Sequence, residues 1–368
     1  RLQRNTADKD FHILDAVDGY TGLAHVPCYA FVIAVIAAVR RQIESDGHAL
    51  LPVRQRLTVE SIGLFGRRKA GILPDRPRAA RVHRGLHTPR IGRFTGDGAK
   101  MIQPVEIIRR ILSMSSIKRL RGTLLAVPVV NVFGFNAHTR YLPDRRDLNR
   151  CFPGKEAGSM AARLAHIFLS EIVSRCDIGI DLHTAAIHRD NFPQIRADLK
   201  DPQLNVLAKA FGAPVILHSA PPDGALRHAA AEASVPVMVY EAGEALRFDE
   251  VSIRVGVSGV INVMREMGMI AKSKSKRLKP SALLRSSAWM RASKSGILRA
   301  TAKLGDMVEE GDSLGYISDP AGQTDEVIHA TTSGIIIGRT NIPLVYEGEA
   351  LFHVGRTRQT ELLEEHLD

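Results

Sequence analysis

Two stretches of this 368-residue chain combine side-chain types that could do chemistry together. Arg140–Gly154 holds four arginines and two aspartates, and Ile180–Ala185 is a short apolar run that contains His183. An arginine fork matches a carboxylate through two parallel hydrogen bonds. A histidine at a strand end can bind a metal through a neutral imidazole nitrogen. These residues favour an anion-recognition loop beside a metal ligand.

The loop also has a purely structural interpretation. Arg140, Asn149 and Arg150 are the candidate donors to a bound carboxylate. The aspartates Asp144 and Asp147 could instead pair with the arginines inside the loop. The residue types alone leave a substrate-binding loop and a salt-bridged loop equally open.

Two further residues could take part in catalysis. Asp181 lies two positions before His183, so on a strand both point to one face, and the carboxylate could orient the imidazole. A histidine considered alone is more often a hydrogen-bonded residue at the edge of a core. Glu241 follows the apolar run Val237–Tyr240 and is a candidate general base for activating water, with Glu244 as the competing choice.

The elements that must position these residues alternate between strand and helix patterns. Expected helices cover 105–114, 159–175, 201–212, 224–234 and 248–269, and expected strands cover 124–132, 176–182, 214–218 and 236–240. Such alternation predicts an α/β layer architecture with a parallel or mixed sheet.

The texture changes after a polar, basic linker expected at 273–287. Residues 288–356 hold short β-rich runs separated by Gly and Asp turns, which predicts a small all-β module. Its Gly-Asp repeats resemble the barrel-sandwich folds of lipoyl and biotinyl carriers. Those carriers modify a lysine, and no Lys follows Lys303, which argues against a swinging-arm role.

The N-terminal part has an unusual composition. Residues 51–100 contain 12 Lys or Arg and 3 Asp or Glu, most of the chain's net charge of +11. A nucleic-acid binder could concentrate charge in this way, but no reader motif is visible. The most apolar run, 29–39, is about half the length that spans a bilayer, so we expect no membrane association. Three irregularly spaced cysteines favour a reducing compartment, and we expect a cytoplasmic protein.

Three motifs in order carry a resemblance to a known family. Asp147–Gly154, Ile180–Ala186 followed by Arg189–Pro193, and Tyr240–Gly243 resemble the succinylglutamate desuccinylase/aspartoacylase family, whose members are related to the zinc carboxypeptidases. The resemblance covers about residues 103–356. It implies an α/β, mixed-sheet, zinc-carboxypeptidase-like domain with a small C-terminal all-β barrel-sandwich-like module.

The resemblance also implies an activity and a site. The expected protein is a zinc-dependent hydrolase, with one zinc ion, that cleaves an amide bond in an N-acyl amino acid or similar small substrate. In such enzymes zinc and a glutamate activate the attacking water. His183 would bind the zinc, and Glu241 would be the catalytic base. The residues that would bind the substrate are Arg140, Asn149, Arg150 and Arg189.

One part of the family's site is missing. The family's first two zinc ligands come from a His-Gly-Asp-Glu motif, and the matching position here reads Thr95-Gly-Asp-Gly98. A catalytic zinc needs about three protein ligands, so His183 alone does not suffice. His83 and His87 have helical spacing, but nearby Pro and Gly disfavour a helix.

Two explanations stay open for the missing ligands. The region up to residue 102 is rich in Arg, Gly and Pro and has no Glu between Glu60 and Glu106, as a shifted reading frame or a disordered segment would produce. Alternatively, the chain has lost its metal and become a carboxylate-binding pseudoenzyme. Another frame that encodes His-x-x-Glu before residue 103 would support the first explanation.

The sequence therefore predicts four parts: an atypical region 1–102, a catalytic-like α/β domain 103–272, a linker 273–287 and a β module 288–356. The leading function is a deacylase acting on an acylated amino acid or related amide. The alternatives are a metal-free carboxylate-binding protein and nucleic-acid binding through residues 51–100. Homo-oligomerisation is left open by the sequence.

Overall fold

The computed structural model describes residues 102–271, 280–322 and 325–356, together with the short strands β1 (His12–Leu14) and β2 (Thr58–Glu60). Several expectations fall outside these described residues: the basic stretch 51–100 apart from β2, the pair His83 and His87, and the segment Thr95–Gly98. Within the described ranges, no helix has the length and apolar character needed to cross a bilayer.

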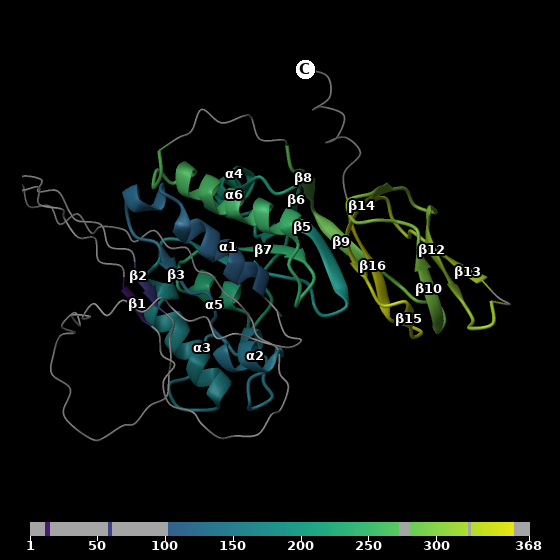
Figure 1. The fold of residues 1–368 in the computed structure, drawn as a ribbon, viewed down its shortest axis with the longest axis horizontal. Helices are drawn as coiled ribbons and strands as arrows, with labels where there is room; N and C mark the ends of the chain where they lie inside the picture. Colours follow the sequence, from purple (N-terminus) through teal and green to yellow (C-terminus); the bar gives the residue numbers. More distant parts are fainter. Residues whose placement is uncertain (1–11, 15–57, 61–101, 272–279, 323–324, 357–368) are drawn as a thin grey trace, which may run out of the picture.

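A mixed nine-stranded sheet forms the backbone of the fold (Figure 1). Its main order is β4-β7-β5-β14-β16-β9, and β6 pairs with both β5 and β8. β4 pairs in parallel with β7, whereas β5 is antiparallel to β7. The strands of its α/β half are β4 (Gly179–His183), β5 (Arg189–Ala197), β6 (Val215–His218), β7 (Val237–Gly243) and β8 (Ala282–Leu284). The predicted α/β class and mixed sheet are confirmed.

Helices cover both faces of this half of the sheet (Figure 1). One layer contains α1 (Ile102–Ser113), α4 (Pro202–Phe211) and α6 (Glu250–Glu266). The other layer contains α3 (Met160–Glu171), α5 (Leu226–Glu232) and the short α2 (Val132–Ala137). Leu182, Ile195 and Tyr240 are fully buried against the first layer. Because side chains alternate along a strand, the intervening residues face the second layer.

Local signals explain where the helices begin and end. Asp201 accepts hydrogen bonds from the backbone N–H groups of Gln203 and Leu204, and Pro202 opens α4. Gly212, with φ 77°, ends the same helix in the left-handed conformation that glycine adopts without steric cost. Ser159 caps α3 through the N–H of Ala162. These caps fix helices close to their predicted bounds.

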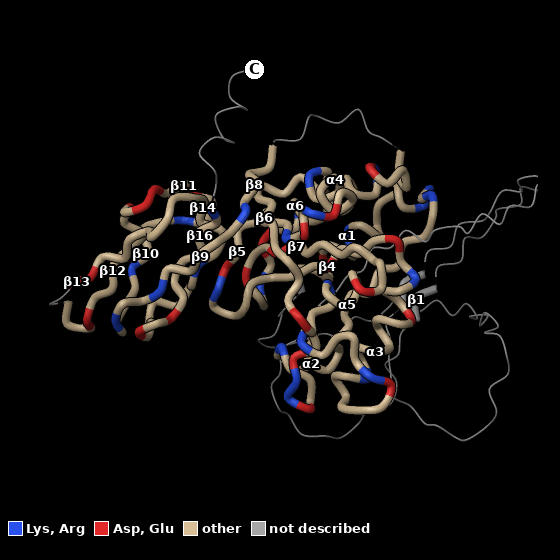
Figure 2. Tube along the Cα trace, turned by 180° about the vertical axis from the view of Figure 1, so that it is seen from behind, with Lys and Arg blue, Asp and Glu red and all other residues tan. Residues whose placement is uncertain are grey.

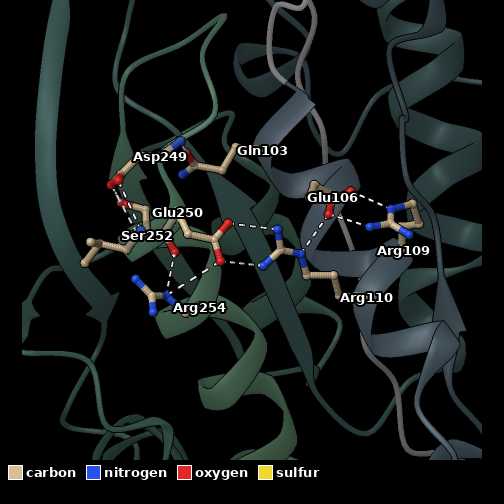
Figure 3. Close-up of polar contacts among 9 residues, drawn as sticks. Gln103, Glu106, Arg109, Arg110, Asp249, Glu250, Ser252 and Arg254 are labelled. Atoms are coloured by element: carbon tan, nitrogen blue, oxygen red, sulfur yellow. Dashed lines mark hydrogen bonds and ion pairs between the residues drawn. The ribbon is translucent and has the colours of Figure 1, made fainter.

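The start of α1 is tied to β7 and α6 (Figure 3). The buried Gln103 amide donates to the carbonyl of Ala242, 2.8 Å away, and its oxygen accepts from the N–H of Asp249. Further along α1, Arg110 donates two hydrogen bonds of 2.8 Å to Glu250. The strand end that carries Glu241 is therefore held from the first helical layer.

The C-terminal part is β-rich, as predicted, but its strands do not close into a barrel. β14, β16 and β9 belong to the nine-stranded sheet, and β13-β12-β10-β15 form a second sheet. Leu298, Ile317 and Phe352 are in the core of this module. The strands are β9 (Ser286–Arg291), β10 (Gly296–Ala300), β11 (Met307–Val308), β12 (Ser313–Ser318), β13 (Asp325–His329), β14 (Gly334–Thr340), β15 (Leu344–Val345) and β16 (Ala350–Arg356). Because β14 pairs with β5, one sheet runs through both parts.

Three local predictions were wrong. The expected strand 124–132 is reduced to β3 (Leu125–Ala126), which pairs with β2, because Asn131 caps α2 directly afterwards. Glu241 lies inside β7 rather than just past it. The nine-residue strand β5 was not predicted at all.

Candidate active site

The polar candidates lie on one face of the central sheet. His183 of β4 is directly opposite Glu241 of β7, and Glu241 is directly opposite Gln194 of β5. Asp181 and Arg196 follow at the next position on the same face, on either side of Val239. Directly paired residues share a face of a sheet, so the strand register brings these side chains together.

Glu241 is held by two donors from β5. Asn191 donates its amide N–H to Glu241 Oε2 at 2.8 Å, and the Arg196 guanidinium lies 3.1 Å from the same oxygen. Gln194 is fully buried, and its oxygen accepts from Arg196. The Glu241 side chain is 18% exposed, so its carboxylate is oriented by the protein while still open to solvent.

His183 is paired with Asp181. The His183 Nε2 lies 2.8 Å from Asp181 Oδ2, and the Asp181 side chain is only 1% exposed. Burial lowers the pKa of His183, but the charges of Asp181 and Glu241 outweigh burial and raise it above its usual value. A carboxylate on one ring nitrogen is how proteins orient a metal-binding histidine through the other.

The described residues nevertheless do not fit a complete zinc site. In the ranges covered by the structure, no group of three or more His, Cys, Asp or Glu side chains could hold a metal ion. Zinc at a catalytic site takes about three protein ligands. His183 is therefore a single candidate ligand.

Positively and negatively charged residues gather in the loop beside α2 (Figure 2). One ion pair and hydrogen bonds to backbone groups stabilise this loop. Arg140 pairs with Asp147 at 2.8 Å, and the other oxygen of Asp147 accepts from the N–H of Asn149. Asp144 accepts from the N–H of Ala161 at the start of α3. Asp147 thus pairs with an arginine of the loop, as the structural interpretation required, whereas Asp144 binds backbone N–H groups instead. Arg140 still lies close enough to the site for its charge to act on His183.

The other expected substrate-binding residues differ in position. The Asn149 oxygen accepts from the N–H of Leu226, which ties the loop to α5. Arg150 is exposed and donates to the backbone carbonyl of Asn149, so no described contact brings it to Glu241. Arg189 opens β5, and its guanidinium carbon lies 5.2 Å from the ring centroid of Trp289 in β9.

The structure adds residues that the sequence did not single out as site candidates: Asn191, Gln194, Arg196 and Arg227. Arg227 lies on α5 and donates to the carbonyl of Ser219. Burial lowers its pKa from the usual value, although the negative charges of Asp181 and Glu241 act to raise it. Gln194 and Arg196 alternate with apolar neighbours, a pattern typical of a strand with one polar and one apolar face. The alanine-rich sequence around Arg227 shows no pattern that marks Arg227 as a site residue.

Part of the chain is similar to known proteins. Residues 102–267 match the model of the succinylglutamate desuccinylase/aspartoacylase catalytic domain. The chain is 25% identical over 257 residues to the N-alpha-acetyl-L-2,4-diaminobutyric acid deacetylase of Halomonas elongata, covering 66% of this chain and 75% of that relative.

Solved structures share the fold. A succinylglutamate desuccinylase/aspartoacylase from Rhodobacter sphaeroides has 25% identity and a TM-score of 0.61, covering 71% of this chain and 83% of that one. The product-bound ectoine utilization protein EutE (DoeB) from Ruegeria pomeroyi has 23% identity and a TM-score of 0.63, covering 71% and 82%.

Strands β4 to β7 of the mixed sheet and its two helical layers lie in the part of the chain that matches this catalytic-domain model. Residues 102–267 match the catalytic domain of the succinylglutamate desuccinylase/aspartoacylase family, as the motifs indicated, and the solved structures with the same fold are members of that family. Relatives in this family are named as deacetylases and desuccinylases of N-acyl amino acids.

Proposed function

We propose that the protein hydrolyses the amide bond of an N-acylated amino acid or a similar small amide. The observation that carries the proposal is the position of Glu241, opposite His183 and held by Asn191 and Arg196, within a family catalytic domain. The named activity of the Halomonas relative supports the substrate class.

Glu241 is the proposed general base. Its carboxylate takes a proton from a water molecule, the water oxygen attacks the acyl carbonyl carbon, and the proton passes to the amine nitrogen as the C–N bond breaks. The products are a carboxylic acid and a free amino acid. Glu244 is the weaker candidate, since its oxygens accept from the His188 N–H and the Asn341 amide.

Arginines are the proposed partners of the negative charges. Arg227 is within electrostatic reach of Glu241, so it is placed to stabilise a carboxylate or the developing oxyanion. Arg140 lies near His183 but shares its charge with Asp147. His183 is the one described residue that we propose as a zinc ligand, because the described residues do not fit a complete zinc site. The proposed steps of hydrolysis do not involve the metal.

Release of free amine tests the proposal. Purified full-length protein would be incubated with N-acetyl-L-2,4-diaminobutyrate, N-succinyl-L-glutamate and N-acetyl-L-aspartate, with and without added zinc. We expect amine release from at least one substrate and a loss of roughly a hundredfold or more in Glu241→Gln. Glu232→Gln is the matched control, because Glu232 lies on the surface of α5 with a side chain 63% exposed.

A second candidate function is metal-free binding of carboxylates. It is favoured by the lack of a multi-residue metal cluster in the described part of the chain. No amine release from any of the three substrates, combined with carboxylate binding by equilibrium dialysis, would select this function over hydrolysis.

A further inference from the structure

The polar face of the sheet continues from the candidate active site into the β module. Asn191 of β5 is directly opposite Gly338 of β14, Gly338 is opposite His353 of β16, and His353 is opposite Trp289 of β9. Residues paired in this way point to one face, so the row leads from Asn191 beside Glu241 to Trp289. Gly338 contributes no side chain, so the Asn191 and His353 side chains approach each other over it: a Cβ at this position would lie 2.8 Å from Asn191 Oδ1 and 3.3 Å from His353 Cβ.

Trp289 is held by stacking. Its ring lies 4.3 Å from the ring of His353, with an angle of 8° between the planes. His353 is 5% exposed, and its Nε2 lies 2.8 Å from the Ser287 hydroxyl. Burial and the charge of Arg196 lower the pKa of His353 to about 3, so the ring is neutral at neutral pH. Because the His353 ring is neutral, it does not repel a positively charged arginine nearby.

That neighbouring arginine is Arg189. Its guanidinium lies 5.2 Å from the Trp289 ring centroid, and a flat guanidinium over an indole face is a favourable contact. Arg189 is two positions before Asn191 in β5, so both side chains lean to the face that carries Glu241. The stack therefore fixes a cation at the border of the candidate site.

The charge of Arg189 has no carboxylate partner among the described residues. Two other arginines near the site differ: Arg140 pairs with Asp147, and Arg196 pairs with Glu241. Arg227 donates to Ser219 instead. A half-buried arginine that is oriented by stacking and not neutralised is suited to bind an incoming anion.

We propose that Arg189 binds a carboxylate of the substrate and determines specificity for it, and that Trp289, backed by His353, is the residue that positions Arg189. The proposal rests on the proposed function for the identity of the substrate. The bound group is either the α-carboxylate of the amino acid or a terminal carboxylate of a dicarboxylic acyl group. In both cases the β module contributes directly to substrate recognition.

Kinetics with pairs of charged and uncharged substrates distinguish the α-carboxylate from the acyl-group carboxylate as the group that Arg189 binds. N-acetyl-L-2,4-diaminobutyrate would be compared with its C-terminal carboxamide, and N-succinyl-L-glutamate with N-butyryl-L-glutamate. We expect Arg189→Met to raise KM about tenfold or more for the acid of one pair, with kcat changed less than about twofold, and to leave the uncharged analogue unaffected. The pair that responds identifies the carboxylate.

Variants of Trp289 separate positioning from general stability. Trp289→Leu should raise KM in the same direction, Trp289→Phe should keep an aromatic face and remain near wild type, and Trp289→Leu with Arg189→Met should be no worse than Arg189→Met alone. Tyr346→Leu is the control, because Tyr346 is an exposed aromatic residue of the same module. Additive effects, or equal effects on acid and amide, would overturn the proposal. Arg189→Lys keeps the charge but not the fork, and serves if Arg189→Met does not fold.

A binding readout keeps the inference independent of catalysis. Trp289 is the only tryptophan in the sequence, so intrinsic tryptophan emission reports on this position alone. Titration with N-acetyl-L-2,4-diaminobutyrate and with N-succinyl-L-glutamate should change the emission for at least one of them, more than its uncharged analogue does, and Arg189→Met should abolish that difference. If no substrate is hydrolysed but this response is present, the proposed function fails while the carboxylate site stands. An identical response to acid and analogue in both pairs refutes the site even if hydrolysis occurs.

Discussion

Asn149 accepts a hydrogen bond from the backbone N–H of Leu226, 2.8 Å from its side-chain oxygen, although the residues lie 77 positions apart. Leu226 is the first residue of α5, and the N-cap residue Ala225 offers no side chain for capping. Asn149 thus supplies from the charged loop the cap that α5 lacks, directly before Arg227. Its amide N–H₂ remains the group that the family resemblance assigns to substrate.

The two roles of Asn149 can be separated by substitution. Asn149→Ala should lower the free energy of unfolding by about 1 kcal/mol, the usual cost of losing a helix cap. Asn149→Asp keeps an acceptor for Leu226 and should remain stable, but it loses the amide donor and should reduce kcat/KM by about tenfold. Chemical denaturation and amine release measure the two effects. An unchanged rate in Asn149→Asp would remove Asn149 from substrate binding.

The absence of a side chain at Gly338, in β14, should be needed for the hydrogen bond between Asn191 and Glu241. A Cβ at Gly338 would lie 2.8 Å from Asn191 Oδ1 and 3.3 Å from His353 Cβ. Gly338→Ala should therefore turn the Asn191 amide away and break its 2.8 Å hydrogen bond to Glu241. We expect kcat to fall about tenfold, with the free energy of unfolding changed by less than about 1 kcal/mol.

The comparison variant for Gly338→Ala is Asn191→Ala. Because both changes remove the same hydrogen bond, the double variant should be no slower than either single variant. Steady-state kinetics and thermal unfolding would be measured on all three. Independent, multiplying losses of kcat would show that Gly338 does not act through Asn191.

The elements that the sequence predicted correctly are marked by residues close to them in the sequence. Asp201 and Gly212 mark the ends of α4 because capping is decided by a few neighbouring residues. β5 was missed because Pro193 interrupts its pattern, and the structure has a register shift in its pairing with β7 between Asn191 and Gln194. Proline in a strand is compatible with such a bulge, but only the pairing partner reveals it.

In the candidate site, too, some residues could be predicted from local sequence and others could not. His183 and Glu241 could be selected from residue type and expected strand ends. Asn191 and Arg196 reach Glu241 only through the register between β5 and β7, which periodicity in a single strand does not contain. The contact of Arg189 with Trp289 joins strands about one hundred residues apart and has no local signal at all.

Acid should weaken the ion pairs that Glu106 forms with Arg109 and Arg110 within α1 (Figure 3). The Arg109 hydrogen bond lowers the pKa of Glu106 most, burial opposes it, and Arg110 lowers it further, from 4.5 to about 2. Because the folded-state pKa is depressed, the stabilisation is complete above about pH 4.5 and is lost as the pH falls toward 2. The Arg109 side chain is 61% exposed, so solvent screening limits the contribution to about 1 kcal/mol.

Glu106→Gln checks this expectation. The variant should be less stable than wild type by about 1 kcal/mol at pH 7, and the difference should vanish as the pH falls toward 2. Urea unfolding across this pH range measures it. Glu171→Gln is the control, since Glu171 pairs with Arg175 on α3 and both side chains are more than half exposed. A stability difference that is constant with pH would exclude the ionised Glu106 as its cause.

Zinc binding should depend on residues before α1. The described residues supply His183 but no cluster of three ligands, and the segment Thr95–Gly98 stands where the family has His-Gly-Asp-Glu. We expect the purified chain to hold less than one zinc per molecule and Thr95→His/Gly98→Glu to bring the content toward one. Adding His183→Ala to that double variant should remove the gain, because about three protein ligands are needed. Metal content by mass spectrometry after dialysis gives the stoichiometry, with Thr95→His alone as the control. One tightly held zinc in the unmodified chain would show that other residues complete the site.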